Sequence, residues 1–130
     1  MNIIPQESMN KNNRIIWICL TAVYMLGILY ASTIPGSHAQ SGTYSPAMEA
    51  FKNFLHFPAY GTLGYLLMRS FSSNRWPVLI SAFFLATGWG VLNEIVQSFV
   101  PHRYWSYQDM CVNALGAGIV IAWMGRRVRV

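Results

Sequence analysis

The stretch IIWICLTAVYMLGILYASTI, residues 15–34, is 20 residues long and carries no charged side chain. An α-helix rises about 1.5 Å per residue, so about 20 apolar residues in helical form span the hydrocarbon core of a bilayer. We therefore expect a transmembrane helix here. The segment Ser37-His38-Ala39 imitates a signal cleavage site. The apolar stretch is longer than the apolar region of a signal peptide, so we expect the helix to be retained.

The composition extends this expectation to the whole chain. Of the 130 residues, 54% are hydrophobic and only 10% are charged, whereas about 25% are charged in a typical soluble domain. This length suits one domain, and most of its surface is expected to face lipid. The net charge is +5, but the basic residues flank apolar runs instead of forming the single basic patch that nucleic acid requires. We expect no nucleic-acid partner.

Three further apolar stretches predict three more helices. Together the four are expected at about residues 15–34, 51–71, 78–100 and 109–125, after a cytoplasmic tail over residues 1–14. Pro77 suits the first turn of a helix, and Gly, Ser and Thr between Pro35 and Pro46 indicate a loop. The predicted fold class is an all-α integral membrane bundle of four transmembrane helices, formed by a single domain over residues 15–127.

The basic residues predict the orientation of this bundle. Seven of the nine fall on one side of the predicted topology: Lys11, Arg14, Arg69, Arg75, Arg126, Arg127 and Arg129. Basic residues concentrate on the cytoplasmic side of membrane proteins. Both termini are therefore predicted to be cytoplasmic, and the protein is expected in the bacterial inner membrane as a multi-pass protein. Cys19 and Cys111 then lie near opposite faces, too far apart for a disulfide.

The remaining polar residues of the predicted helices map to the outer side, at the ends of three separate segments. They recur at spacings of three or four, which places each set on one helix face. Small residues at Gly61, Gly64, Ala114, Ala117 and Gly118 permit close helix approach. We therefore predict an extracytoplasmic polar pocket. Its candidate ligand-binding residues are Lys52, His56, Tyr60, Glu94, Gln97, Arg103, Asp109 and Asn113.

Three linked motifs carry a resemblance to a known family. They are Lys52-Xaa3-His56-Phe57-Xaa2-Tyr60, Asn93-Glu94-Xaa2-Gln97-Xaa3-Pro101-Xaa-Arg103 and Asp109-Xaa3-Asn113-Xaa2-Gly116. In this order, over roughly residues 25–124, they resemble the pattern of the VanZ-like family of small bacterial membrane proteins. That family takes its name from an accessory glycopeptide-resistance protein, and most members have no assigned activity. This chain departs from the pattern at Phe51, Asn93 and His102, where two acidic residues and a glycine are usual.

Each of these residues has a structural reading beside a functional one. Glu94 either pairs with a cation to fix helix packing or acts as a general base, and His56 either bonds at a helix end or exchanges protons. These two are the candidate catalytic residues. Lys52 and Arg103 either clamp a phosphate or face headgroups. Asp109 suits a helix cap, and Asn113 a bond between helices. No spacing typical of a metal site occurs, and we expect neither metal nor cofactor.

Three functions fit these residues. The first is an accessory envelope protein that binds an anionic lipid headgroup or envelope precursor, as the resemblance to the glycopeptide-resistance family implies. The second is a membrane enzyme acting on a phosphate-bearing lipid. The third is a small transporter, which would need polar residues through the membrane depth. The expected partners are membrane lipids and an envelope lipid precursor, and so small a bundle is compatible with a homo-oligomer.

Overall fold

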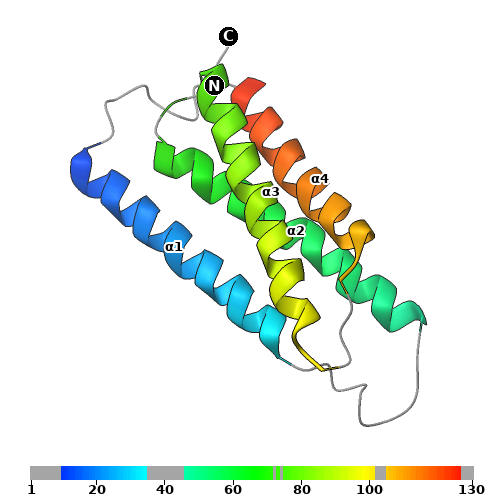
Figure 1. Ribbon diagram of the computed structural model, residues 1–130. Helices are drawn as coiled ribbons and strands as arrows, with labels where there is room; N and C mark the ends of the chain where they lie inside the picture. Colours follow the sequence, from blue (N-terminus) through cyan, green and yellow to red (C-terminus); the bar gives the residue numbers. More distant parts are fainter. Residues whose placement is uncertain (1–9, 35–45, 72, 74, 102–104, 127–130) are drawn as a thin grey trace.

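The computed structural model describes residues 10–34, 46–71, 73, 75–101 and 105–126 (Figure 1). Within these residues the chain forms four α-helices and no strands: α1 (Lys11–Thr33), α2 (Pro46–Phe71), α3 (Trp76–Ser98) and α4 (Tyr107–Arg126). The predicted all-α class and the predicted number of helices are therefore confirmed for the described chain.

All four helices begin earlier than the apolar pattern predicts, at Lys11, Pro46, Trp76 and Tyr107. The helix α1 starts at Lys11, inside the predicted tail, because the Asn10 side chain accepts a hydrogen bond from Asn12 N and caps the polar first turn. The helix α2 starts at Pro46, five residues before the predicted position at 51. Pro77 lies in the first turn of α3, where its missing N–H costs nothing.

The start of α4 corrects the cap predicted from the sequence. This helix begins at Tyr107, and Ser106 stands immediately before it. The Ser106 hydroxyl accepts a hydrogen bond from Asp109 N at 3.4 Å. Ser106 therefore caps the helix, while the Asp109 carboxylate lies in the first turn, where it complements the helix dipole.

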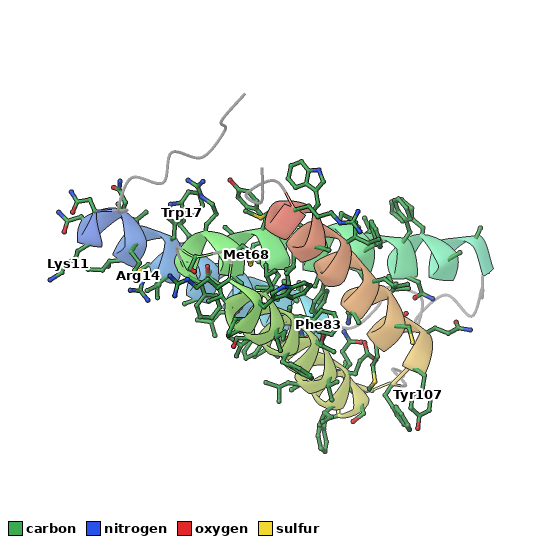
Figure 2. The ribbon with its side chains drawn as sticks, turned by 90° about the horizontal axis from the view of Figure 1, so that it is seen from above. Lys11, Arg14, Trp17, Met68, Phe83 and Tyr107 are labelled. Carbon is green, nitrogen blue, oxygen red and sulfur yellow. The ribbon has the colours of Figure 1, made fainter. Side chains whose placement is uncertain are left out.

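Consecutive helices run in opposite directions, which gives the bundle two chemically different ends (Figure 1). At one end lie the start of α1, the end of α2, the start of α3 and the end of α4. This end, here called the basic end, carries Lys11, Arg14, Arg69, Arg75 and Arg126. The opposite end, here called the polar end, carries Glu94 and Asp109. Figure 2 shows Lys11, Arg14 and Trp17 at one end and Tyr107 at the other.

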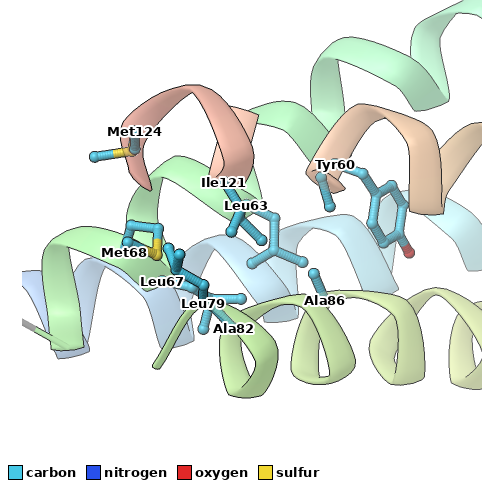
Figure 3. Packing of buried hydrophobic residues seen from close by; sticks show 10 residues of the cluster. Tyr60, Leu63, Leu67, Met68, Leu79, Ala82, Ala86, Ile121 and Met124 are labelled. Atoms are coloured by element: carbon cyan, nitrogen blue, oxygen red, sulfur yellow. The ribbon is translucent and has the colours of Figure 1, made fainter. Parts of the chain in front are cut away.

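The core lies where α2, α3 and α4 meet, and it is built from leucine, isoleucine, methionine and alanine side chains with Tyr60 (Figure 3). Glycines on α2 and α4 let these two helices pack with backbones nearly in contact. A Cβ atom added at Gly64 would lie 3.0 Å from the Ala117 carbonyl oxygen, and one added at Gly116 would overlap the Phe57 carbonyl oxygen. This close approach brings the polar residues of α2 and α4 together.

The outer surface of the bundle is strongly apolar. Large hydrophobic side chains are exposed on all four helices, among them Val23, Phe54, Phe84 and Ile119. By length and apolarity, two of the described helices, α1 and α3, suffice to cross a membrane. Only 11% and 33% of their apolar windows are buried in the bundle. Most of that apolar surface therefore faces outward, unlike the core helix of a soluble protein.

Candidate functional site

A hydrogen bond between α2 and α4 organises the polar end. His56 Nδ1 lies 3.0 Å from Asn113 Oδ1. The imidazole is stacked in a nearly parallel orientation on Tyr60, one turn further along α2, with ring centroids 6.4 Å apart and an interplanar angle of 3°. An amide oxygen only accepts hydrogen bonds, so with this amide orientation His56 carries its proton on Nδ1. In the neutral ring, Nε2 is then the basic nitrogen.

The Asn113 amide is almost completely buried against α3. Its residue is 1% exposed, and it fills the space left by the missing side chain of Gly90. A Cβ atom at Gly90 would lie 3.1 Å from Asn113 Nδ2 and 3.2 Å from Tyr60 Cε1. Within the described chain, Asn113 Nδ2 is buried and donates no hydrogen bond. A buried amide donor of this kind is costly unless an acceptor is supplied.

A second polar contact joins α2 to α3 and extends to α1. Asn93 Nδ2 donates to the Tyr60 hydroxyl oxygen at 2.6 Å. Asn93 Oδ1 lies 3.4 Å from the hydroxyl of Ser32, near the end of α1. All three residues are buried. Through these contacts α1, α2 and α3 are fixed relative to one another at the same end as the His56–Asn113 bond.

Glu94 connects α3 to the segment that leads into α4. Its Oε2 accepts a hydrogen bond from Ser106 N at 3.0 Å, and the carboxyl group is completely buried. Ser106 in turn caps α4, so Glu94 positions the start of the helix that carries Asn113.

The structure brings most of the predicted site residues to one end of the bundle. Tyr60, Glu94, Gln97 and Asn113 are buried there, and His56 and Asp109 are half-buried. Lys52 lies on α2 one turn before His56, but its side chain is outside the described part of the structure, as are Arg103 and His102. Phe51, which replaces an acidic residue of the family pattern, is exposed.

Sequence reasoning did not identify the roles of Ser32, Asn93 and Ser106. Asn93 was considered only as a departure from the family pattern, yet its side chain links two helices. Its position beside Glu94 near the end of α3 was the available signal. Ser32 lies at the corresponding depth near the end of α1 and belongs to the same end by topology. Ser106 occupies the position three residues before Asp109 that defines a capping motif.

The donors and acceptors of this cluster suit recognition by hydrogen bonds. Among the described residues, no three His, Cys, Asp or Glu side chains come together in a way that could hold a metal ion. The cluster instead offers a buried amide donor, an imidazole and a carboxylate. Such a set is suited to binding a polar group that carries both oxygen acceptors and hydroxyl donors.

The fold and this cluster define the class of protein. An α-helical bundle with an apolar exterior, two helices able to cross a bilayer and polar residues at one end has the features of a membrane protein. The chain belongs to the VanZ/LLP1 family, whose model matches residues 1–126. The resemblance found in the sequence motifs is thereby confirmed. Neither the curated proteins nor the solved structures include a match to the chain.

Proposed function

We propose that all four helices cross the bacterial inner membrane and that both termini are cytoplasmic. The alternating helix directions and the five described cations at the basic end support this orientation. The helices α2 and α4 are less apolar than α1 and α3 because they carry the glycines and polar residues that face each other. Their outward residues, such as Phe54, Tyr65, Leu115 and Ile119, are apolar and exposed.

This topology is tested by labelling single cysteines in a chain that also carries Cys19→Ser and Cys111→Ser. Tyr107 and Arg126 are exposed and lie at the two ends of α4. In intact cells with a permeable outer layer, Tyr107→Cys is expected to react with an impermeant maleimide. Arg126→Cys is expected to react only after lysis. Reaction of both positions from the same side would contradict the four crossings.

In this orientation, we propose an accessory envelope protein whose polar end binds an anionic headgroup of a lipid or a lipid-linked envelope precursor. One observation carries the proposal. Of the five largest side chains that are less than 2% exposed, four have polar groups: Tyr60, Glu94, Asn93 and Asn113. Burying such groups in a membrane bundle is costly, so residues of this kind are commonly functional.

The positive charges that an anionic headgroup needs would come from two basic residues, whose positions are known from the order of the chain. Lys52 lies on α2 one turn before His56, and Arg103 lies in the connection before α4. An arginine offers two parallel N–H donors to a phosphate, and a lysine a point charge. Asn113 Nδ2, which is buried and makes no hydrogen bond within the described chain, would supply a further donor to an oxygen of the headgroup.

The binding proposal is tested with undecaprenyl phosphate as the probe. Purified protein in detergent is titrated with undecaprenyl phosphate and with uncharged undecaprenol, and the bound lipid is measured by native mass spectrometry. Wild type is expected to prefer the phosphate. Asn113→Ala and Arg103→Ala are each expected to weaken its binding about tenfold, the effect of losing one charge-assisted hydrogen bond.

The matched control is Ser98→Ala at the same end of the bundle. Ser98 is exposed, and its hydroxyl donates only to Ile95 O of its own helix. This variant is expected to bind like wild type. Equal binding of undecaprenyl phosphate and undecaprenol by wild type would refute the proposed headgroup recognition.

A membrane enzyme acting on a phosphate-bearing lipid is the second candidate, and the geometry of His56 favours it. With Nδ1–H directed to Asn113 Oδ1, the neutral ring presents Nε2 as a base, which is the arrangement of a general acid–base catalyst. Lipid profiles of a deletion strain complemented with wild type, with His56→Gln or with Glu94→Gln would distinguish the candidates. Identical profiles in all three would exclude a chemical role of His56 and Glu94.

A further inference from the structure

A second cluster lies at the basic end, between α1 and α2. The guanidinium carbon of Arg69 lies 4.6 Å from the centroid of the Trp17 ring, within the range of a cation–π interaction. Trp17 also contacts Tyr65, which lies one turn before Arg69 on α2. The two rings are in an edge-to-face arrangement with centroids 6.2 Å apart. The Trp17 ring is therefore held by two residues of one helix face.

A buried pair of hydroxyl groups joins the same two helices, with Thr21 one turn after Trp17 on α1 and Ser70 next to Arg69 on α2. Thr21 Oγ1 and Ser70 Oγ lie 2.8 Å apart, and both residues are buried. Each hydroxyl also lies within hydrogen-bonding distance of a carbonyl of its own helix, Thr21 of Trp17 O at 2.8 Å and Ser70 of Leu66 O at 2.9 Å. Because a hydroxyl has one proton, one of the two donates to the other, and the second donates to its own carbonyl. This contact joins α1 to α2 beside the stack of Arg69 on Trp17.

The charge of Arg69 is not balanced by the described part of the chain. Its Nε is buried and makes no hydrogen bond there, while the side chain as a whole is half-buried. The described residues of the basic end include no carboxylate, because Glu94 and Asp109 lie at the polar end. Arg14 adds a second cation three residues before Trp17, on the same face of α1.

We propose that Arg69, stacked on Trp17 and aided by Arg14, binds the phosphodiester of an anionic phospholipid at the basic end. The outer guanidinium nitrogens match two phosphate oxygens. Tyr65, which contacts Trp17, is 37% exposed, and Ile18, the residue after Trp17 on α1, is 47% exposed. Acyl chains would cover them, which favours a lipid over a free phosphate ion. The site is separate from the headgroup site proposed at the polar end.

The experiment titrates the purified full-length protein in detergent with phosphatidylglycerol, with phosphatidylcholine and with inorganic phosphate. Native mass spectrometry measures the bound lipid. Thermal unfolding measures how much inorganic phosphate and phosphatidylglycerol each stabilise the protein. Wild type is expected to bind phosphatidylglycerol at least about tenfold more tightly than phosphatidylcholine. Arg69→Gln is expected to abolish this preference, and Arg69→Lys, which keeps the charge and packing length, to reduce it.

Arg126→Gln is the matched control, because it removes one exposed cation from the same end. It is expected to keep the wild-type preference. The proposal is overturned if Arg69→Lys and Arg69→Gln both bind like wild type, or if Arg126→Gln loses as much preference as Arg69→Gln, since bulk charge would then explain binding. Stabilisation by inorganic phosphate equal to that by phosphatidylglycerol would overturn the assignment to a lipid.

Discussion

Substituting alanine for Gly116 tests whether the close approach of α2 and α4 creates the polar end. A Cβ atom at Gly116 would overlap the carbonyl oxygen of Phe57 and lie 3.3 Å from Gly61 N. Both neighbours are backbone atoms, which cannot rotate aside as a side chain could, so the helices must separate. Overpacking of this kind costs about 1–3 kcal/mol.

The matched control is Gly88→Ala, because a Cβ atom at Gly88 would meet nothing within 4 Å. Both substitutions gain about the same helix propensity, roughly 1 kcal/mol, so their difference isolates the overlap at Gly116. The stability of Gly64→Ala is expected to fall between those of the other two variants. Its new Cβ atom would lie 3.0 Å from Ala117 O and 3.2 Å from Ile121 Cγ1, and the Ile121 side chain can move.

Stability is measured by reversible unfolding of the purified protein in mixed micelles with increasing denaturing detergent. We expect Gly116→Ala to be about 1–3 kcal/mol less stable than Gly88→Ala. It should also bind undecaprenyl phosphate more weakly, because separation of the helices lengthens the His56–Asn113 bond, now 3.0 Å. Equal stability of the two variants would refute the inferred backbone contact.

Two further predictions concern the buried hydrogen bonds. Tyr60→Phe leaves Asn93 Nδ2 without its 2.6 Å acceptor and is expected to lower the free energy of unfolding by about 1–3 kcal/mol in the same assay. Tyr107→Phe, at an exposed tyrosine, is the control. Equal effects of the two substitutions would argue against the Asn93–Tyr60 bond. In a double-mutant cycle, Thr21→Val and Ser70→Ala are expected to show a coupling of about 0.5–1.5 kcal/mol across their 2.8 Å contact, whereas additive effects would show that the two hydroxyl groups stabilise the protein independently.

The agreement between sequence and structure is greatest where one local property decides the outcome. Runs of about 20 apolar residues predicted the four helices, since helix length and apolarity are read directly from consecutive residues. The bounds were less accurate, because polar residues such as Lys11 continue a helix once Asn10 caps it. The alternating directions of the predicted helices also placed His56, Glu94 and Asn113 at one end of the bundle, which is where the described helices have them.

Which of these residues touch one another depends on contacts that are distant in the sequence. His56 and Asn113 are 57 positions apart, and Asn93 and Tyr60 are 33 apart. Their pairing requires α2 and α4 to meet at Gly116 and α3 to present Gly90 to the Asn113 amide. No periodicity within one helix specifies the rotation of that helix against its neighbours.

The sequence by itself determined an all-helical membrane protein and its family, and its predicted topology placed Glu94 and Asn113 at the same end of the bundle. These properties follow from the apolarity, charge and order of residues along the chain. The tertiary structure decided which polar groups are bonded, that Asn113 Nδ2 is buried without an acceptor in the described chain, and that Arg69 is stacked on Trp17. The physical reason is packing, because small residues at the contacts between helices fix which side chains come within bonding distance.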